Sequence, residues 1–330
     1  MNQKMFCFQC EQTACGKACT GAAGVCGKKA DTAELQDRLT GSLIGLARLI
    51  EGNESLITQE TNVLVTEALF ATLTNVNFDN DAIEELTRRV EEEKQRLAPD
   101  CSVCGSACGR NDNYDMEKLW NADEDVRSLK SLILFGIRGM AAYAYHAAVL
   151  GYTDADVNSF FYKALFAVGM DDWGMDELLP IVLEAGEVNL KCMALLDKAN
   201  TETFGDPVPT EVSLTVEKGP FIVISGHDLY DLKKLLEQTE GKGINIYTHG
   251  EMLPAHAYPE LKNYSHLKGN FGTAWQNQQK EFADIPAPVL FTTNCLMPPK
   301  KSYSDRVFTT EAVASCLYTQ IPESRINTEL

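Results

Sequence analysis

Five cysteines lie close together near the start of this chain, and their spacing points to metal chemistry. They are Cys7, Cys10, Cys15, Cys19 and Cys26, separated by glycine and small polar residues. Soft thiolates select zinc, copper(I) or iron–sulfur clusters. With Cys15 set aside, the spacing is C-x2-C-x8-C-x6-C in a glycine-rich loop that can wrap one compact cluster. This spacing favours an iron–sulfur cluster over a zinc site, and either of them over disulfides.

A second group of candidate ligands lies in the C-terminal half, where each residue follows a short apolar run. His227, Glu251 and Cys295 follow the runs at 220–225, 244–247 and 287–292. In open α/β sheets, sites form at the carboxyl ends of strands, so these three side chains could converge. Imidazole, carboxylate and thiolate together suit iron better than magnesium. Taken singly, each residue is more often a cap, a surface group or core filler.

The whole chain has the composition of a globular protein with an acidic surface. It has 330 residues and a formal net charge of −18. Such a surface repels phosphate backbones and anionic membranes, so we expect neither a nucleic acid nor a membrane partner. No uninterrupted apolar run is long enough to span a bilayer, and the start lacks a signal-like apolar region. We therefore predict a cytoplasmic protein, whose thiols are reduced and available to metal.

The elements that must position these residues divide into two kinds. Helical periodicity predicts helices at 31–50, 56–75, 83–97, 115–149, 154–168 and 175–198, the first opening with a capping box at Asp31. The stretch 201–219 is rich in Thr, Pro and Gly and predicts a domain boundary. After it, strand-like runs alternate with helical patterns, which predicts a Rossmann-like parallel α/β domain. No Gly-x-Gly-x-x-Gly follows the first strand, so a dinucleotide site is not supported.

The predicted fold class is therefore multidomain α plus α/β, with an N-terminal helical bundle followed by the Rossmann-like domain. We assign an iron–sulfur cysteine segment to 1–30, the helical bundle to 31–205 and the α/β domain to 215–330.

The motifs that carry these candidate ligands resemble those of one known family. FCFQCEQTA and GVCGK, together with SGHDL, THGEMLPAH and TTNC, are similar to segments of the hybrid-cluster (prismane) proteins, identified as hydroxylamine reductases. The resemblance implies a [4Fe–4S] cluster, or in some branches a [2Fe–2S] cluster, on Cys7, Cys10, Cys19 and Cys26. It also implies that His227, Glu251 and Cys295 are ligands of a hybrid iron–sulfur–oxygen (4Fe-2O-2S) cluster. His249 and His256 are not expected to be ligands.

The remaining cysteines match no ligand position of that family. Cys15 is expected to be a bystander, and Cys192 lies on an apolar helix face and is expected in the core. The central loop with Cys101, Cys104 and Cys108 offers three thiols and no nearby His, and the family has no cluster in the corresponding loop. Cys316 lies in a tail that cannot be mapped onto the family.

The resemblance implies a function and two partners. The reaction would be reduction of hydroxylamine to ammonia and water, or reduction of nitric oxide, at the hybrid cluster. The N-terminal cluster would relay electrons from an external reductase to a small N–O substrate. Family members have a third domain that supplies further ligands, and we expect it to be absent here, which leaves the hybrid cluster incomplete. The alternatives are an iron–sulfur electron-transfer fragment without catalysis and a helical structural zinc protein.

Overall fold

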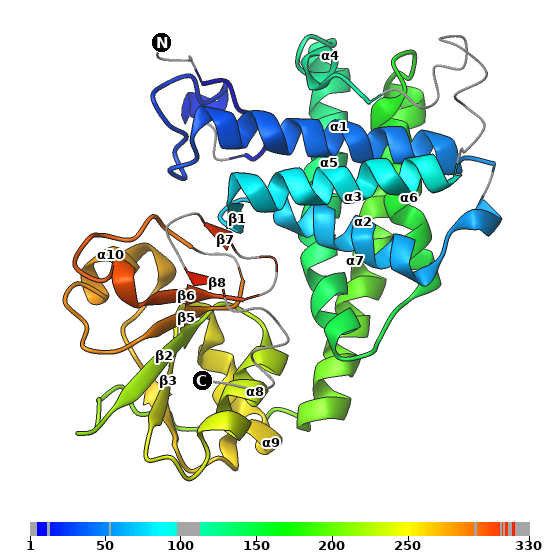
Figure 1. Cartoon of the computed structure of the whole chain (residues 1–330). Helices are drawn as coiled ribbons and strands as arrows, with labels where there is room; N and C mark the ends of the chain where they lie inside the picture. The colour runs from blue at the N-terminus through cyan, green and yellow to red at the C-terminus, as the bar shows by residue number, and fades with distance from the viewer. Residues whose placement is uncertain are drawn as a thin grey trace. The chain divides into compact units, whose positions relative to one another are not determined.

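The computed structural model describes residues 5–11, 14–52, 54–97, 113–293, 296–310, 312, 314–315 and 319–320. These residues form two compact units, each drawn in Figure 1. Unit 1 comprises the described parts of Met1–Leu73 and Asn80–Leu196. Unit 2 comprises the described parts of Thr74–Asp79 and Asp197–Leu330. Helix α7 begins in unit 1 and ends in unit 2.

Unit 1 is built from helices. They are α1 (Ala30–Ile50), α2 (Gln59–Ala71), α3 (Asn80–Leu97), α4 (Met116–Trp120), α5 (Glu124–Val149), α6 (Ala155–Gly169) and the first part of α7 (Met175–Phe204), with short 3-10 turns η1 (Ala14–Gly16) and η2 (Glu54–Leu56). Helix α1 packs against α3 and α6, and α2 packs against α5. Leu39, Leu43 and Leu46, which recur at helical spacing along α1, are fully buried. The apolar face of α1 is therefore the centre of this core.

Several helix ends differ from the sequence prediction. The capping box at Asp31 is wrong, because α1 begins at Ala30 and its N-cap Lys29 makes no side-chain cap bond. The carboxylate of Asp31 accepts instead from the Thr32 amide within the first turn. The helix predicted at 115–149 is two helices, because the Asp123 side chain caps α5. Helix α7 runs on to Phe204 and stops where Gly205 adopts a φ of 85°.

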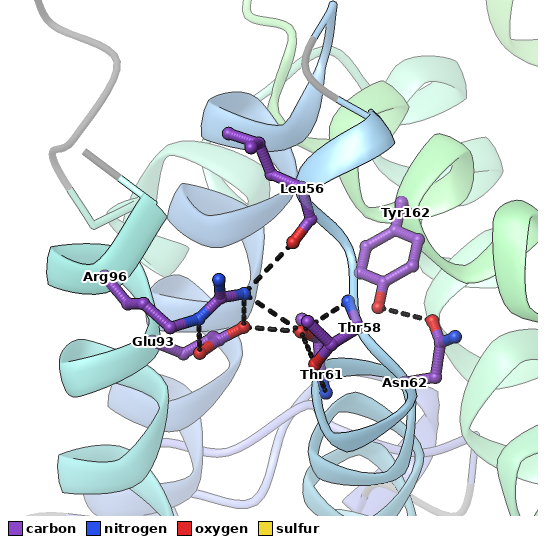
Figure 2. Close-up of polar contacts among 7 residues, drawn as sticks. All are labelled: Leu56, Thr58, Thr61, Asn62, Glu93, Arg96 and Tyr162. Carbon is purple, nitrogen blue, oxygen red and sulfur yellow. Dashed lines mark hydrogen bonds and ion pairs between the residues drawn. The ribbon is translucent and has the colours of Figure 1, made fainter.

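The start of α2 is held by polar contacts to its neighbours, which Figure 2 shows. Thr58 and Thr61 form a reciprocal capping box. The Thr61 hydroxyl donates to Glu93 on α3, and Arg96 pairs with Glu93 and donates to the Leu56 carbonyl at 3.1 Å. Capping groups satisfy amides that the first helical turn leaves unpaired. This network therefore fixes where α2 begins relative to α3.

Replacing Thr58 by Ala removes the side-chain acceptor of this cap. We expect the free energy of unfolding to fall by about 1 kcal/mol. The matched control is Ser128→Ala on α5, whose exposed hydroxyl bonds only a carbonyl of its own helix, and its change should stay within about 0.5 kcal/mol. Urea unfolding followed by circular dichroism measures both. Equal losses in the two variants would show that the cap does not matter.

Unit 2 contains a parallel sheet of six strands. They are β2 (Phe221–Ser225), β3 (Asn245–His249), β4 (Leu267–Asn270), β5 (Val289–Phe291), β6 (Val307–Thr309) and β8 (Thr319–Gln320), in the order β4-β3-β2-β5-β6-β8. Between them run α8 (Leu229–Thr239), η5 (Gly250–Ala257), α9 (Pro259–Lys262), η6 (Trp275–Asn277), α10 (Gln278–Glu281) and η7 (Ser304–Arg306). Numbered along the chain, this is the strand order 3-2-1-4-5-6 of dinucleotide-binding folds. The predicted fold class, helices followed by a parallel α/β part, is confirmed.

A short segment within the helical half of the sequence, Thr74–Asp79, belongs to unit 2. Strand β1 (Asn77–Phe78) pairs in parallel with β7 (Ala314–Ser315), and the Asn77 side chain donates to the Ala312 carbonyl at 3.1 Å. The amide of Leu296 donates to the carbonyl of Asn75. Sequence periodicity gave no sign of this pairing, because two-residue strands carry no pattern.

Helix α5 is apolar enough to raise the question of a membrane span. Among the described helices, it alone has the length and composition of such a span, with a mean hydropathy of 1.3 over its most apolar window. Of that window, 56% is buried inside the structure. Core helices of globular proteins pass the same test, so the composition of α5 follows from its packing against α2 and α6.

Candidate functional site

Two of the predicted cluster ligands face each other across the N-terminal segment. The amide of Cys7 donates to the Cys19 carbonyl at 3.1 Å, and the amide of Cys19 donates back to the Cys7 carbonyl at 2.8 Å. Both side chains are buried, at 6% and 7% exposed, and pack with Met5 and Ala33. This antiparallel bridge brings together thiols that are well separated in the sequence.

The other N-terminal cysteines differ in exposure. Cys10 and Cys26 are half-buried, whereas Cys15 is exposed and has a φ of 56° inside the turn η1. A Cβ on Gly24 would lie 3.2 Å from the Met5 side chain and in ordinary contact, at 3.5 Å, with the Cys26 sulfur. All five are free thiols. Exposure thus separates Cys15 from the four cysteines predicted to be ligands.

A buried polar network contacts the cysteine segment and ties it to two helices. Lys28 donates to the side-chain oxygens of Gln9, at 2.6 Å, and of Gln36 on α1. The Gln9 amide nitrogen donates to Asp37 at 2.8 Å. Arg138 on α5 donates to the Gln9 carbonyl at 2.8 Å and to the Thr40 hydroxyl at 2.9 Å. Gln9 therefore joins the cysteine segment to both α1 and α5.

Burial and charge act in opposite directions on the Cys7 thiol. Burial raises its pKa above the ordinary value, while the charge of Lys28 and a backbone hydrogen bond at Gln9 oppose the rise. Without a ligand the thiol is therefore held protonated. A metal must displace that proton, because only the thiolate is a metal ligand.

The free thiols and the buried Arg138 guanidinium supply the soft ligands and positive charge that an anionic iron–sulfur cluster requires. Among the described residues, no three His, Cys, Asp or Glu side chains gather around one point as the ligands of a single ion do. A tetrahedral zinc site holds four ligands at about 2.0–2.3 Å from one ion. A four-iron cluster is larger, so its thiolates stand further apart. The Arg138 Nε is buried and, within the described residues, has no hydrogen-bond partner. Thiol ligands, together with a buried guanidinium nitrogen that has no hydrogen-bond acceptor among the described residues, fit an anionic cluster.

In unit 2, two of the predicted ligands follow neighbouring strands. Each stands the same number of residues after a strand residue that pairs with the other strand. Ser225 of β2 pairs with His249 of β3, and His227 and Glu251 each lie two residues further on. Ser225 also pairs with Phe291 of β5. All three strands are parallel, so these positions share the carboxyl edge of the sheet. The β2–β5 neighbourhood is the point where the strand order reverses, the usual ligand position in such sheets.

His227 is exposed, and the Thr293 hydroxyl contacts both its backbone and its ring. Its amide donates to the Thr293 hydroxyl at 2.7 Å, and its ring Nδ1 lies 3.0 Å from the same oxygen. Hydrogen bonds of this kind orient a histidine for metal binding. Glu251 is exposed in η5. Cys295 lies outside the described residues, so its place as the third predicted ligand stays a prediction, as does the loop with Cys101, Cys104 and Cys108.

The two histidines set aside as ligands are engaged inside unit 2. His249 Nδ1 lies 3.0 Å from the Ser225 hydroxyl, and its Nε2 lies 3.1 Å from Glu281. His256 Nε2 lies 2.9 Å from the Thr248 hydroxyl. Burial lowers the pKa of both imidazoles. As predicted for the core, Cys192 is buried, and its thiol contacts the Met140 carbonyl.

Lys28 and Arg138, two of the four buried lysine and arginine side chains among the described residues, were not identified from the sequence as buried cations. Arg138 lies within LILFGIRGMAAYAY, and a lone arginine inside such an apolar helical run is the signal that was available. Long charged side chains are almost never fully buried unless they are paired. Lys28 gave no comparable signal, because it follows a glycine loop in which exposed lysines are common.

Gly226, between β2 and His227, allows the close approach of β5. Its φ is 122°, and an added Cβ would lie 2.6 Å from the Thr292 hydroxyl and 2.8 Å from the Thr293 amide. We expect Gly226→Ala to lower the free energy of unfolding by roughly 2 kcal/mol or more. Gly241→Ala is the control, since Gly241 also has a positive φ but open space around it, and it should cost about 1 kcal/mol. Urea unfolding measures both, and equal costs would contradict the steric argument.

Comparison with known proteins finds extensive similarity. The family model described as Prismane/CO dehydrogenase family matches residues 5–327. A protein named hydroxylamine reductase from Thermodesulfovibrio yellowstonii is 50% identical over 330 residues, covering 94% of this chain and 60% of the relative. One of the same name from Syntrophobacter fumaroxidans is 47% identical, covering 94% and 61%. Another, from Thermosipho melanesiensis, is 45% identical, covering 96% and 62%. This chain therefore spans 60% to 62% of the length of these relatives.

Proposed function

Because this chain belongs to the Prismane/CO dehydrogenase family, we propose that it forms part of an iron–sulfur oxidoreductase that reduces hydroxylamine. The reaction breaks the N–O bond, consumes two electrons and two protons, and releases ammonia and water. Relatives with 45% to 50% identity carry the name hydroxylamine reductase. The observation that carries the proposal is the buried pairing of Cys7 with Cys19 beside Lys28 and Arg138.

In this proposal Cys7, Cys10, Cys19 and Cys26 hold a [4Fe–4S] cluster, with a [2Fe–2S] cluster as the variant form. When bound, that cluster supplies one-electron transfer, and the hybrid cluster of the family supplies iron that binds the N–O substrate. The chain's own residues do the positioning. The Cys7–Cys19 backbone bridge fixes two sulfurs, and burial of both side chains excludes water. Electrons come from an external reductase, and the protein acts in the cytoplasm.

His227, Glu251 and Cys295 are proposed as the ligands that this chain contributes to the hybrid cluster. The equal offset of His227 and Glu251 from the Ser225–His249 pair supports the first two. The Thr293 hydroxyl orients the His227 ring. Cys295 follows β5, the strand on the other side of β2. In the sequence, the three residues therefore follow three adjacent parallel strands, and the reversal point of the sheet lies between two of these strands, β2 and β5.

A second candidate function is electron transfer without catalysis. The chain spans 60% to 62% of its relatives. The family resemblance implies further hybrid-cluster ligands beyond His227, Glu251 and Cys295. A site with an incomplete ligand set loses metal affinity and geometry. Under this alternative, the N-terminal cluster assembles and exchanges electrons, while no hydroxylamine is consumed.

A serine scan tests the ligand assignment. We expect Cys7→Ser, Cys10→Ser, Cys19→Ser and Cys26→Ser each to lower bound iron and sulfide, because a hydroxyl is a poor substitute for a thiolate. Cys15→Ser is the matched control and should bind as much iron as the unchanged chain. Anaerobic purification followed by iron, sulfide and visible-absorption measurements provides the readout. Loss of iron in Cys15→Ser equal to the others would mean that a different set of four is used.

Activity is tested in a chimera, since the relatives are longer than this chain. The chain is joined in frame to the part of the Thermodesulfovibrio yellowstonii protein that it does not cover. We expect this chimera to form ammonia from hydroxylamine with reduced methyl viologen, and the chain alone to form little or none. His227→Ala or Glu251→Ala in the chimera should reduce turnover at least a hundredfold, in line with the loss of a metal ligand. His266→Ala is the control, because His266 stands just before β4, at the amino ends of the strands and not at the carboxyl ends that carry the candidate ligands. Full turnover in the His227 and Glu251 variants would reject these ligands.

A further inference from the structure

Lys28 and Arg138 are two cations that the protein buries beside the cysteine segment. Lys28 is 3% exposed and Arg138 is 2% exposed. Burying a charge is costly unless it is paired and hydrogen-bonded. Their charge therefore calls for a buried anion.

The hydrogen-bond acceptors around these cations are mostly neutral. The Lys28 ammonium donates to the amide oxygens of Gln9 and Gln36. The Arg138 guanidinium donates to a backbone carbonyl and to the Thr40 hydroxyl. Its Nε has no hydrogen-bond partner among the described residues. Hydrogen bonds to neutral groups orient a cation but do not balance its charge.

One carboxylate, Asp37, lies within electrostatic range of both cations. Burial raises its pKa, and the Gln9 hydrogen bond and the charges of Arg138 and Lys28 oppose the rise. Glu34 acts on Asp37 from an exposed position. Two buried cations thus face one half-buried carboxylate. Among the described groups bonded to Gln9, the two buried cations therefore outnumber the one carboxylate.

The thiols of the segment also lie close to the two cations, because Gln9, which both cations contact, stands between Cys7 and Cys10, and Lys28 lies two residues after Cys26. Burial lowers the pKa of Arg138, and negative charge on Asp37, Cys7 and Cys10 opposes that lowering. The charge of Lys28 acts on Cys7. A cluster held by four thiolates carries more negative charge on its ligands and sulfides than its iron carries positive charge. It is therefore an anion in both oxidation states, and more so when reduced.

We propose that Lys28 and Arg138 are the fixed counter-charges of the N-terminal cluster and raise its reduction potential. The inference rests on the proposed cluster at Cys7, Cys10, Cys19 and Cys26. An added electron makes the cluster more negative, so cations held nearby in a buried site stabilise the reduced form more than the oxidised form. Gln9 contacts both cations and also Asp37, so it sets their positions relative to the segment.

The test is the midpoint potential of the N-terminal cluster, measured by a redox titration followed by electron paramagnetic resonance. In Arg138→Met and Lys28→Met we expect the equilibrium constant for one-electron reduction to fall at least tenfold, which is about 59 mV towards negative potentials. Lys29→Met removes the same charge from an exposed neighbour and should leave the potential unchanged. An unchanged potential in cluster-loaded Arg138→Met and Lys28→Met would overturn the proposal.

If the methionine variants do not assemble a cluster, variants that keep the positive charge test the proposal instead. Arg138→Lys and Lys28→Arg should then retain iron, sulfide and a potential near that of the unchanged chain. If they lose the cluster as the methionine variants do, shape and not charge is responsible, and the proposal is rejected. Failure of the underlying function looks different, because the unchanged chain itself would then bind neither iron nor sulfide.

Discussion

The cysteine segment depends on Gln9, which bonds in four directions at once. Its side-chain oxygen accepts from Lys28, its amide nitrogen donates to Asp37 and to the Ala33 carbonyl, and its backbone carbonyl accepts from Arg138. A loop without regular structure has few backbone bonds of its own, so such contacts fix its position. Through Gln9 the segment is attached to α1 and α5, the longer helices of the core of unit 1. The geometry of Cys7 and Cys10, on either side of Gln9, follows from this attachment.

In unit 2, the register of the strands positions the candidate ligands. Pairing of Ser225 with both His249 and Phe291 places the residues that follow these strands at one edge. Gly226 lets the segment after β5 approach so closely that Thr293 contacts both the amide and the ring of His227. A side chain at Gly226 would separate these segments. The backbone pairing of the strands therefore sets the positions of the residues at this edge, and the candidate ligands are among these residues.

Buried polar groups play different parts in the two units. Around β3 they bond one another, as with His249 between the Ser225 hydroxyl and the Glu281 carboxylate. Around the cysteine segment they are charged and only partly balanced, with Asp37 as the carboxylate that both cations act on. A satisfied network rigidifies a core, whereas a network with surplus charge is arranged for a ligand of the opposite sign. That contrast is the physical reason to connect Lys28 and Arg138 with the thiolates.

The sequence by itself determined the order of helical and α/β parts, the apolar face of α1, and the candidate ligands at strand ends. Periodicity and residue chemistry are local, so they can be read along the chain. Only the tertiary structure decided that Cys7 pairs with Cys19, that Arg138 of α5 reaches Gln9, and that β1 (Asn77–Phe78) pairs with β7. Each of these joins residues far apart in the sequence. Such contacts arise from packing and hydrogen-bond geometry, which no local pattern records.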